Sequence, residues 1–250
     1  MTPAHSPRQN HLLAALPATD LNALAADLEL VKMALGDIVC EPDKALLHAY
    51  FPTTAVVSLH HLTNSGALAE SAGVGREGMV GIALFMGGDS MPSSAVVQNG
   101  GHGYRMAREP LVRAFACAGP LRSVLLRYTQ ALIAQIGQTV ACYRHHTVEQ
   151  QLCRWLLSTA GRLPPGELMM TQELVAGLLG VRRESISAAA SKLRDAGYIR
   201  YRRGHISILD PSGLETRACE CYAVVNTEMQ RLLPRPPAPA GNAHLKAKHD

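Results

Sequence analysis

Arg183 and Glu184 are adjacent in the chain, and their side chains could recognise the edges of DNA bases. An arginine can donate two hydrogen bonds to guanine, and a glutamate can accept one from cytosine in the major groove. Both residues fall on the polar face of a predicted helix, whose other exposed positions carry short side chains. Such a face suits a helix that is inserted into a major groove.

The stretch around this pair is strongly basic. Between Val181 and His205 there are seven Lys or Arg residues and two acids, a net charge of +5. Basic side chains bind nucleic-acid phosphates, which set the register of a protein on the duplex without reading its sequence. The predicted phosphate contacts are Thr171, Arg182, Ser185, Arg202 and Arg203. A solvated basic face on an ordinary helical hairpin is the alternative interpretation of the same charge.

Residues 171–209 have the pattern of a winged helix-turn-helix, which would hold these side chains in place. The first helix follows a candidate N-cap, Thr171, and carries four apolar residues at helical spacing: Leu174, Val175, Leu178 and Leu179. Gly180 permits a sharp turn before the second helix. The buried face predicted for that helix is Ile186, Ala189, Ala190 and Leu193. Gly197 suits its end, and β-type runs at 198–201 and 205–209 predict a hairpin.

Two segments of the chain resemble the Crp/Fnr family of bacterial transcription regulators. The run VRRESIS at 181–187 is similar to the family's recognition helix, and YRHHTVEQQLCRWLL at 143–157 is similar to the helix that leads into its DNA-binding domain. The resemblance covers roughly residues 10–230 and is strongest after Leu121. It implies base contacts from Arg183, Glu184 and Ser187. Ala188 departs from the family pattern, because well-known members carry a base-reading arginine there, so a different operator sequence is expected.

The resemblance implies an α+β fold with an N-terminal antiparallel, jelly-roll-like β-roll, a long dimerisation helix and a C-terminal winged helix-turn-helix. We expect a β-roll domain at 10–115, the dimerisation helix at 116–145, the DNA-binding domain at 146–231 and a disordered tail at 232–250. Turn residues occur at short intervals through residues 31–110, as expected of an all-β unit. Candidate strands are Ile38–Cys40, Ala55–His60, Ala67–Ser71 and Ala95–Gln98, and residues 211–233 read as one final helix.

The apolar stripe of the long helix could serve a dimer or the subunit's own core. The predicted dimer seam consists of Leu121, Leu125, Tyr128, Leu132 and Ile136. Burial in the chain's own core is the alternative. The basic winged helix-turn-helix, called the reading module below, favours the dimer. Two such modules in a dimer reach half-sites one turn of DNA apart, about 34 Å.

The β-roll sequence departs from the pattern of cyclic-nucleotide-binding members of the resembled family. Those members use a Gly-Glu-x-Gly turn and a downstream arginine, whereas this chain has Gly78–Met79–Val80–Gly81, and no arginine at 92–95. A buried phosphate needs a cation or several backbone donors to compensate its charge. We therefore expect an unknown small-molecule effector other than cAMP, or none.

Cysteines and histidines are the remaining residues with ligand chemistry. Six cysteines occur without a CxxC pair, and free thiols are expected. Neighbouring histidines such as His145 and His146 point in different directions and rarely share one metal. No metal and no cofactor are predicted. Whether Cys219 and Cys221, or the histidine pairs, bind metal or haem stays open.

Charge and composition complete the functional interpretation. Residues 1–110 carry 6 basic and 10 acidic side chains and residues 111–250 carry 18 and 10, so the positive charge lies in the second part. No secretory signal or membrane span is expected, which indicates a cytoplasmic protein. The function predicted is a homodimeric transcription regulator, not an enzyme, that binds double-stranded DNA, with RNA polymerase as a further candidate partner. The alternative is a signal-binding or protein-interaction module whose helix-turn-helix does not read DNA.

Overall fold

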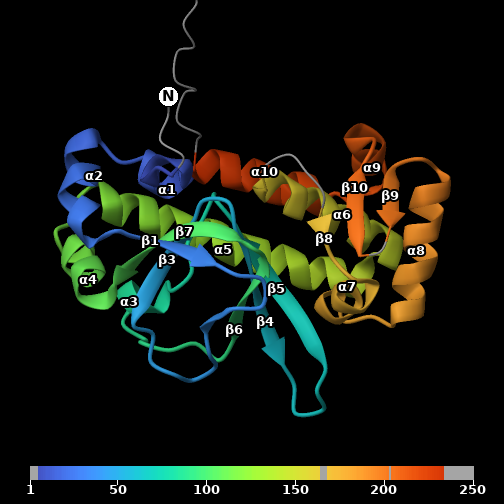
Figure 1. Cartoon of the computed structure of the whole chain (residues 1–250), viewed down its shortest axis with the longest axis horizontal. Helices are drawn as coiled ribbons and strands as arrows, with labels where there is room; N and C mark the ends of the chain where they lie inside the picture. The colour runs from blue at the N-terminus through green and yellow to red at the C-terminus, as the bar shows by residue number, and fades with distance from the viewer. Residues whose placement is uncertain (1–4, 164–167, 203, 234–250) are drawn as a thin grey trace, which may run out of the picture.

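The computed structural model describes residues 5–163, 168–202 and 204–233. A β-roll occupies the N-terminal part, and a long helix, α5 (Pro120–His145), runs from beneath it to the C-terminal helices (Figure 1). Within the described residues, no helix combines the length and the apolar character that crossing a membrane requires. The α+β fold class expected from the sequence is confirmed.

The N-terminal segment is a pair of short helices fastened to the β-roll. Helix α1 (His11–Ala14) and helix α2 (Ala18–Leu24) are separated at Pro17, as expected from a residue that cannot continue a helix. The buried side chain of Asn10 caps α1 and donates hydrogen bonds from Nδ2 to the carbonyls of Pro52 and Gly78 at 2.9 and 2.8 Å. Short 3-10 helices at Pro7–Gln9 and Ala25–Asp27 flank the pair.

Two antiparallel sheets form the β-roll. One has the order β1 (Glu29–Met33), β7 (Gly101–Ala107), β3 (His48–Pro52), and the other the order β2 (Ile38–Cys40), β6 (Ser94–Asn99), β4 (Val56–Leu62), β5 (Leu68–Val74). All four strands of the second sheet were expected from the sequence, whereas the first sheet was not. Its central strand, β7, contains Gly103, where a Cβ would lie 3.0 Å from the carbonyl oxygen of Phe51. This is closer than ordinary van der Waals contact, so the position favours glycine. Helices α3 (Ala83–Met86) and α4 (Arg108–Ala116) complete this unit.

Helix α5 covers the β-roll with the apolar stripe that was predicted to be the dimer seam. Leu121, Leu125, Tyr128 and Leu132 are buried in the core shared with the sheets, and Ile136 packs against its edge. Within one subunit these residues therefore have the role that was the alternative to the dimer seam, because the open side of the β-roll needs an apolar cover and this stripe supplies it. A different face of α5 is exposed and apolar: Leu126, Ile133 and Val140 are 50%, 61% and 65% exposed.

The C-terminal part is a winged helix-turn-helix with its own core. It contains α6 (Val148–Arg162), β8 (Leu168–Met169), α7 (Gln172–Leu179), α8 (Arg183–Asp195), β9 (Ile199–Arg202) and β10 (His205–Ile208). The strands pair in the order β8-β10-β9. Trp155 on α6 is buried with Leu178 and Leu193 in this second core, which is separate from that of the β-roll.

The last part of the chain forms two helices where the sequence predicted one. Helix α9 (Pro211–Arg217) ends at Ala218, whose φ of −70° and ψ of 157° are extended, and α10 (Cys221–Leu232) begins three residues later. Helix α10 runs back along α5 toward α1, and Leu233 packs against the β-roll core (Figure 1). The tail expected to be disordered from residue 232 is helical at Leu232, and residues 234–250 lie outside the described part. The division into folding domains stays a prediction.

Candidate nucleic-acid interface

The turn between α7 and α8 sets the angle at which α8 is presented. The Oγ1 of Thr171 accepts a hydrogen bond from the backbone N–H of Leu174 at 3.1 Å, which confirms Thr171 as the N-cap of α7. Gly180 ends α7 with φ 65° and ψ 32°, in the left-handed region that glycine adopts without strain. Helix α8 therefore starts three residues later, across a tight turn.

Helix α8 has one buried and one solvent-facing side. Four residues, as predicted, form the buried side: Ile186, Ala189, Ala190 and Leu193. Arg182, Arg183, Glu184 and Ala188 are exposed, and Ser185 is half-buried. The N-cap, Arg182, makes no side-chain hydrogen bond to the first turn. The first turn of α8 thus presents the arginine and glutamate pair on an open surface beside backbone N–H groups.

Arg183 has a weak partner that a ligand can displace. Its Nε lies 3.7 Å from Oε2 of Glu173 on α7, and both side chains are more than half exposed. Exposed ion pairs contribute little to stability, because water and salt screen them and the side chains lose entropy when ordered. The guanidinium can therefore leave Glu173 for another acceptor at small cost.

Ser187 has a structural role that the sequence did not indicate. Its Oγ donates a hydrogen bond to Oε1 of Gln172 at 2.6 Å, which joins α8 to the first residue of α7. Ser187 is half-buried, so it is less accessible than Arg183 or Glu184. Gln172 was missed, although its position directly after the N-cap places it on the face of α7 that meets α8. A base contact by Ser187 stays a prediction.

The wing adds a second basic surface. Arg200 and Arg202 alternate with inward-facing residues on β9 and are both exposed. Arg200 was counted in the charge of the stretch but not predicted as a phosphate contact, although the two-residue spacing puts it on the face of Arg202. Tyr201 donates a hydrogen bond to the carbonyl of Met170 at 3.2 Å and anchors the strand. Arg203, a predicted phosphate contact, lies outside the described residues.

Contacts from α6 fix the reading module on the β-roll. Trp155 donates from Nε1 to Oε1 of Glu70 on β5 at 3.0 Å. The Nε of Arg162 lies 2.7 Å from Oε1 of Glu77, and Arg76 donates to the carbonyl of Gly161 at 3.2 Å. Burial raises the pKa of Glu70, although the charges of Arg162 and Arg154 act in the opposite direction.

A small cavity lies in the β-roll where α5 covers it. Its volume is about 110 Å³, and its lining is mostly apolar, with Leu59, Met79, Val80 and Ile136 among the side chains. No lysine or arginine is among the described residues that line it. Met79 is fully buried, and its carbonyl accepts a hydrogen bond from the hydroxyl of Tyr128 at 2.8 Å. Met79 therefore fills the core at the position where the glutamate of a cyclic-nucleotide turn was sought.

Comparison with known proteins bears on both parts of the chain. A family model described as the Crp-like helix-turn-helix domain matches residues 150–217, which run from near the start of α6 to the end of α9. A comparison with curated protein sequences found no match.

Solved structures of regulators share the arrangement of about three quarters of this chain. FixK2 from Bradyrhizobium japonicum has 16% identity and a TM-score of 0.63, over 77% of this chain and 98% of that one. A transcriptional regulator of the CRP family from Thermus thermophilus has 17% identity and a TM-score of 0.63, over 75% and 96%. The c-di-GMP-responsive global regulator CLP from Xanthomonas campestris has 16% identity and a TM-score of 0.62, over 77% and 99%.

At these identities the solved structures establish the fold, and the family model identifies the module that carries Arg183 and Glu184. The resemblance noted in the sequence is thereby confirmed: the chain has the fold of Crp/Fnr-type regulators, and its residues 150–217 match the Crp-like helix-turn-helix domain.

Proposed function

We propose that this chain is a homodimeric, sequence-specific DNA-binding transcription regulator. The observation that carries the proposal is the first turn of α8, where Arg183 and Glu184 are exposed beside each other while the opposite face of the helix is buried. A recognition helix contacts base edges with residues near its N-terminus, and this pair occupies that position. In this proposal Arg183 and Glu184 read bases, and Ser187 reads a neighbouring base after leaving Gln172.

Phosphate contacts would fix the module on the duplex. Arg182 and Ser185 flank the reading pair, Thr171 begins α7, and Arg202 extends the basic surface to the wing. Arg203 is also proposed as a phosphate contact, on the basis of the sequence alone, because it lies outside the described residues. Each neutralised phosphate contributes about −0.9 to the slope of log affinity against log salt concentration, so binding should weaken steeply as salt rises.

The exposed stripe of α5 supports a homodimer with a different seam from the predicted one. Leu126, Ile133 and Val140 follow one another at seven-residue steps, the period that a parallel pair of helices buries. Gly137 lies between them, and a Cβ built there would meet no atom within 4 Å. We propose that two α5 helices pair along this stripe and present two α8 helices to a roughly palindromic site.

The β-roll in this proposal responds to an effector other than a cyclic nucleotide, or to none. The cavity offers apolar walls and no lysine or arginine among its described lining residues. A phosphate buried there would have no lysine or arginine beside it to compensate its charge. RNA polymerase is a proposed partner whose contact depends on where the DNA site lies, and a cytoplasmic location follows from the function.

Selection of bound sequences from a random DNA pool tests this function. The purified protein should enrich one motif with twofold symmetry, and a duplex carrying that motif should bind as one dimer in a mobility-shift titration. A module that serves only protein interactions or signal binding would enrich no motif and would retain no DNA at low salt. That outcome would refute the proposed function.

A further inference from the structure

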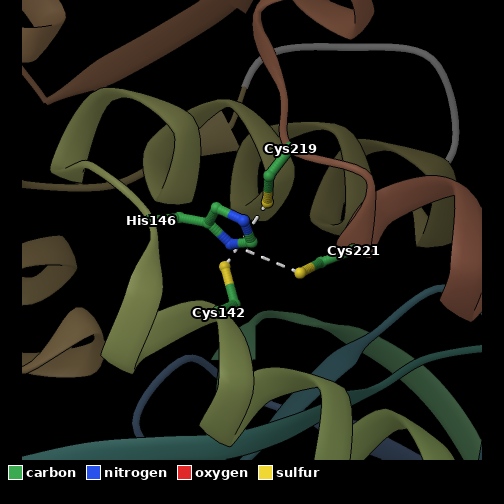
Figure 2. A group of neighbouring side chains, drawn as sticks. All are labelled: Cys142, His146, Cys219 and Cys221. Atoms are coloured by element: carbon green, nitrogen blue, oxygen red, sulfur yellow. Dashed lines mark hydrogen bonds between the residues drawn. The ribbon is translucent and has the colours of Figure 1, made fainter.

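Four side chains with metal-binding atoms meet where α5 ends. Cys142, His146, Cys219 and Cys221 each offer one ligand atom, and these atoms all lie within 4.8 Å of one another. The Sγ atoms of Cys142 and Cys219 are 3.5 Å apart, and Sγ of Cys221 is 3.5 Å from Nδ1 of His146. Figure 2 shows the sulfur atoms of Cys219, which lies between α9 and α10, and of Cys221, the first residue of α10, facing the imidazole of His146 and the sulfur of Cys142.

The chain brings these residues together through two local features. Cys142 lies in the last turn of α5, and His146 is the C-cap, whose backbone N–H still bonds to the carbonyl of Cys142, so the two residues are one helical turn apart. Cys219 and Cys221 come from the break between α9 and α10, at the point where the sequence predicted a continuous helix. In a continuous helix, residues two positions apart would face in different directions. The extended backbone at Ala218 instead lets both cysteines approach α5.

Two of the six separations already match those of a tetrahedral ion, and the others lie within 4.8 Å. Zinc binds cysteine sulfur at about 2.3 Å and histidine nitrogen at about 2.0–2.1 Å, so neighbouring ligand atoms of a tetrahedral site lie roughly 3.5–3.8 Å apart. The two observed separations of 3.5 Å agree with this geometry before any ion is added. An iron–sulfur cluster would hold its thiolates further apart, because the irons and sulfides lie between them. Three cysteines and one histidine are a common structural zinc set.

Neighbouring groups orient two of the four ligands. Nε2 of His146 lies 3.2 Å from Oε1 of Glu220, so the carboxylate favours the tautomer with its proton on Nε2 and leaves the Nδ1 lone pair toward the sulfurs. Gln138 donates from Nε2 to Sγ of Cys221 at 3.1 Å, a hydrogen bond that stabilises a thiolate. Metal-bound histidines characteristically donate their other ring N–H to such a carboxylate.

A buried arginine balances the charge of such a site. Arg154 is 7% exposed, its guanidinium is near the sulfur of Cys142, and its Nε has no hydrogen-bond partner among the described residues. Three thiolates, a neutral histidine and a divalent ion sum to a charge of −1, which the guanidinium neutralises.

We propose that Cys142, His146, Cys219 and Cys221 bind one Zn²⁺, or a divalent ion of similar preference for thiolates, and so fasten the start of α10 to the end of α5. This site goes beyond the proposed DNA reading, and its ligands are separate from Arg183 and Glu184. Binding releases protons, because the ion takes thiolates and not thiols.

Metal analysis of the reduced, full-length protein tests the site directly. We expect about one zinc per chain when the protein is purified without chelators. After the ion is removed, titration with Co²⁺ should give the thiolate-to-cobalt charge-transfer band and the visible bands of a tetrahedral site, saturating at one ion per chain. Cys117→Ser, at an exposed cysteine, and Cys153→Ser, at a buried cysteine outside the group, are the controls and should keep both signals.

Variants of the ligands and of one neighbour make the test specific. Cys219→Ala and His146→Ala should lose stoichiometric Co²⁺ binding, whereas Glu220→Gln should weaken it roughly 10–100-fold, the usual effect of losing the partner of a histidine ligand. The wild-type titration decides the matter even if a variant does not fold.

Three results would overturn the site. The first is a reduced, folded wild-type protein that binds no Co²⁺ or Zn²⁺ above the level of a protein without cysteines. The second is Co²⁺ binding that Cys219→Ala and His146→Ala leave unchanged while circular dichroism shows both folded. The third is a disulfide between Cys142 and Cys219 in the purified protein together with no metal binding after reduction, which would identify a redox pair and not a metal site.

Discussion

Trp155 and Glu70 share a buried hydrogen bond that joins the winged helix-turn-helix to the β-roll. Nε1 of the indole lies 3.0 Å from Oε1 of the carboxyl, and 85 positions separate the two residues in the chain. The other oxygen, Oε2 of Glu70, has no hydrogen-bond partner among the described residues. A buried carboxyl oxygen without a donor favours the neutral, protonated form, because the charge of a carboxylate would be left uncompensated there.

Replacing Glu70 by glutamine should change how stability depends on pH. Burial raises the pKa of Glu70 above its ordinary value of 4.5, against Trp155, Ser58, Arg154 and Arg162, which lower it. The folded state then holds the proton more tightly than the unfolded state. This residue's contribution to stability therefore falls as pH rises from about 4.5 to the raised pKa, by about 1.4 kcal/mol for each unit between the two.

Glu70→Gln keeps an acceptor for Trp155 and removes the ionisation, so this fall should disappear. Urea unfolding of both proteins from pH 4 to pH 8 measures the difference. The wild type should lose stability relative to the variant as pH rises, and the two should be closest at the acidic end. Parallel curves across the range would show that Glu70 is ionised in the folded protein.

Arg183→Ala should weaken binding to the selected DNA motif and leave binding to random DNA almost unchanged. Loss of a bidentate base contact costs roughly 1–3 kcal/mol, about 5- to 150-fold in affinity. Arg194→Ala is the matched control, because Arg194 is exposed in the last turn of the same helix and pairs with Asp195. Equal losses on both DNAs for Arg183→Ala would make it a phosphate contact and not a base contact.

Arg202→Ala should reduce affinity for every duplex to a similar extent. A phosphate contact carries no sequence information, and its loss should lower the slope of log affinity against log salt by about 1. Titrations of the selected motif and of random DNA at several salt concentrations measure both quantities. A loss confined to the selected motif would assign base reading to the wing.

Ile133→Glu should convert the protein to a monomer without unfolding it. Ile133 is 61% exposed in a single subunit, and a charge there is accommodated by water but not by a second apolar helix. Leu62→Glu, at an exposed residue of β4, is the control and should remain a dimer. Light scattering and circular dichroism distinguish the outcomes, and a dimeric, folded Ile133→Glu protein would place the seam elsewhere.

Leu125→Ala tests whether the buried apolar stripe of α5 serves the subunit core while the exposed stripe serves the dimer. Leu125 is fully buried against the β-roll, so its truncation should lower the free energy of unfolding by about 2–5 kcal/mol. At protein concentrations where the variant is folded, its dimerisation should match that of the wild type. A weakened dimer with unchanged monomer stability would restore Leu125 to the seam.

The sequence predicted the reading module well because its signals are local. Thr171, Gly180 and the apolar spacing of α8 act within a few residues of themselves, and the structure places each as expected. The two faces of α5 could not be told apart in the same way. Both Leu125 and Leu126 are apolar, and only the β-roll, far away in sequence, decides which of them is buried.

For a similar reason, local sequence patterns could not predict that Cys142 and His146 lie beside Cys219 and Cys221. The four-residue spacing of the first pair was visible, but 77 positions separate Cys142 from Cys219. The two meet only because Ala218 interrupts the final helix and α10 then packs on α5. Nothing in the composition of residues 211–233 indicated that interruption, since their apolar residues continue at helical spacing across it.

The return of α10 along α5 affects how the reading module can be prepared in isolation. A fragment that began at Thr147 would include α10 but remove the helix on which α10 lies, leaving its apolar side and two of the four sulfur and nitrogen ligands without counterparts. Expression from Pro120 onward keeps both helices in one polypeptide. A unit that carries α8 together with both of these helices is thus longer than the matched segment 150–217 by a whole helix on each side.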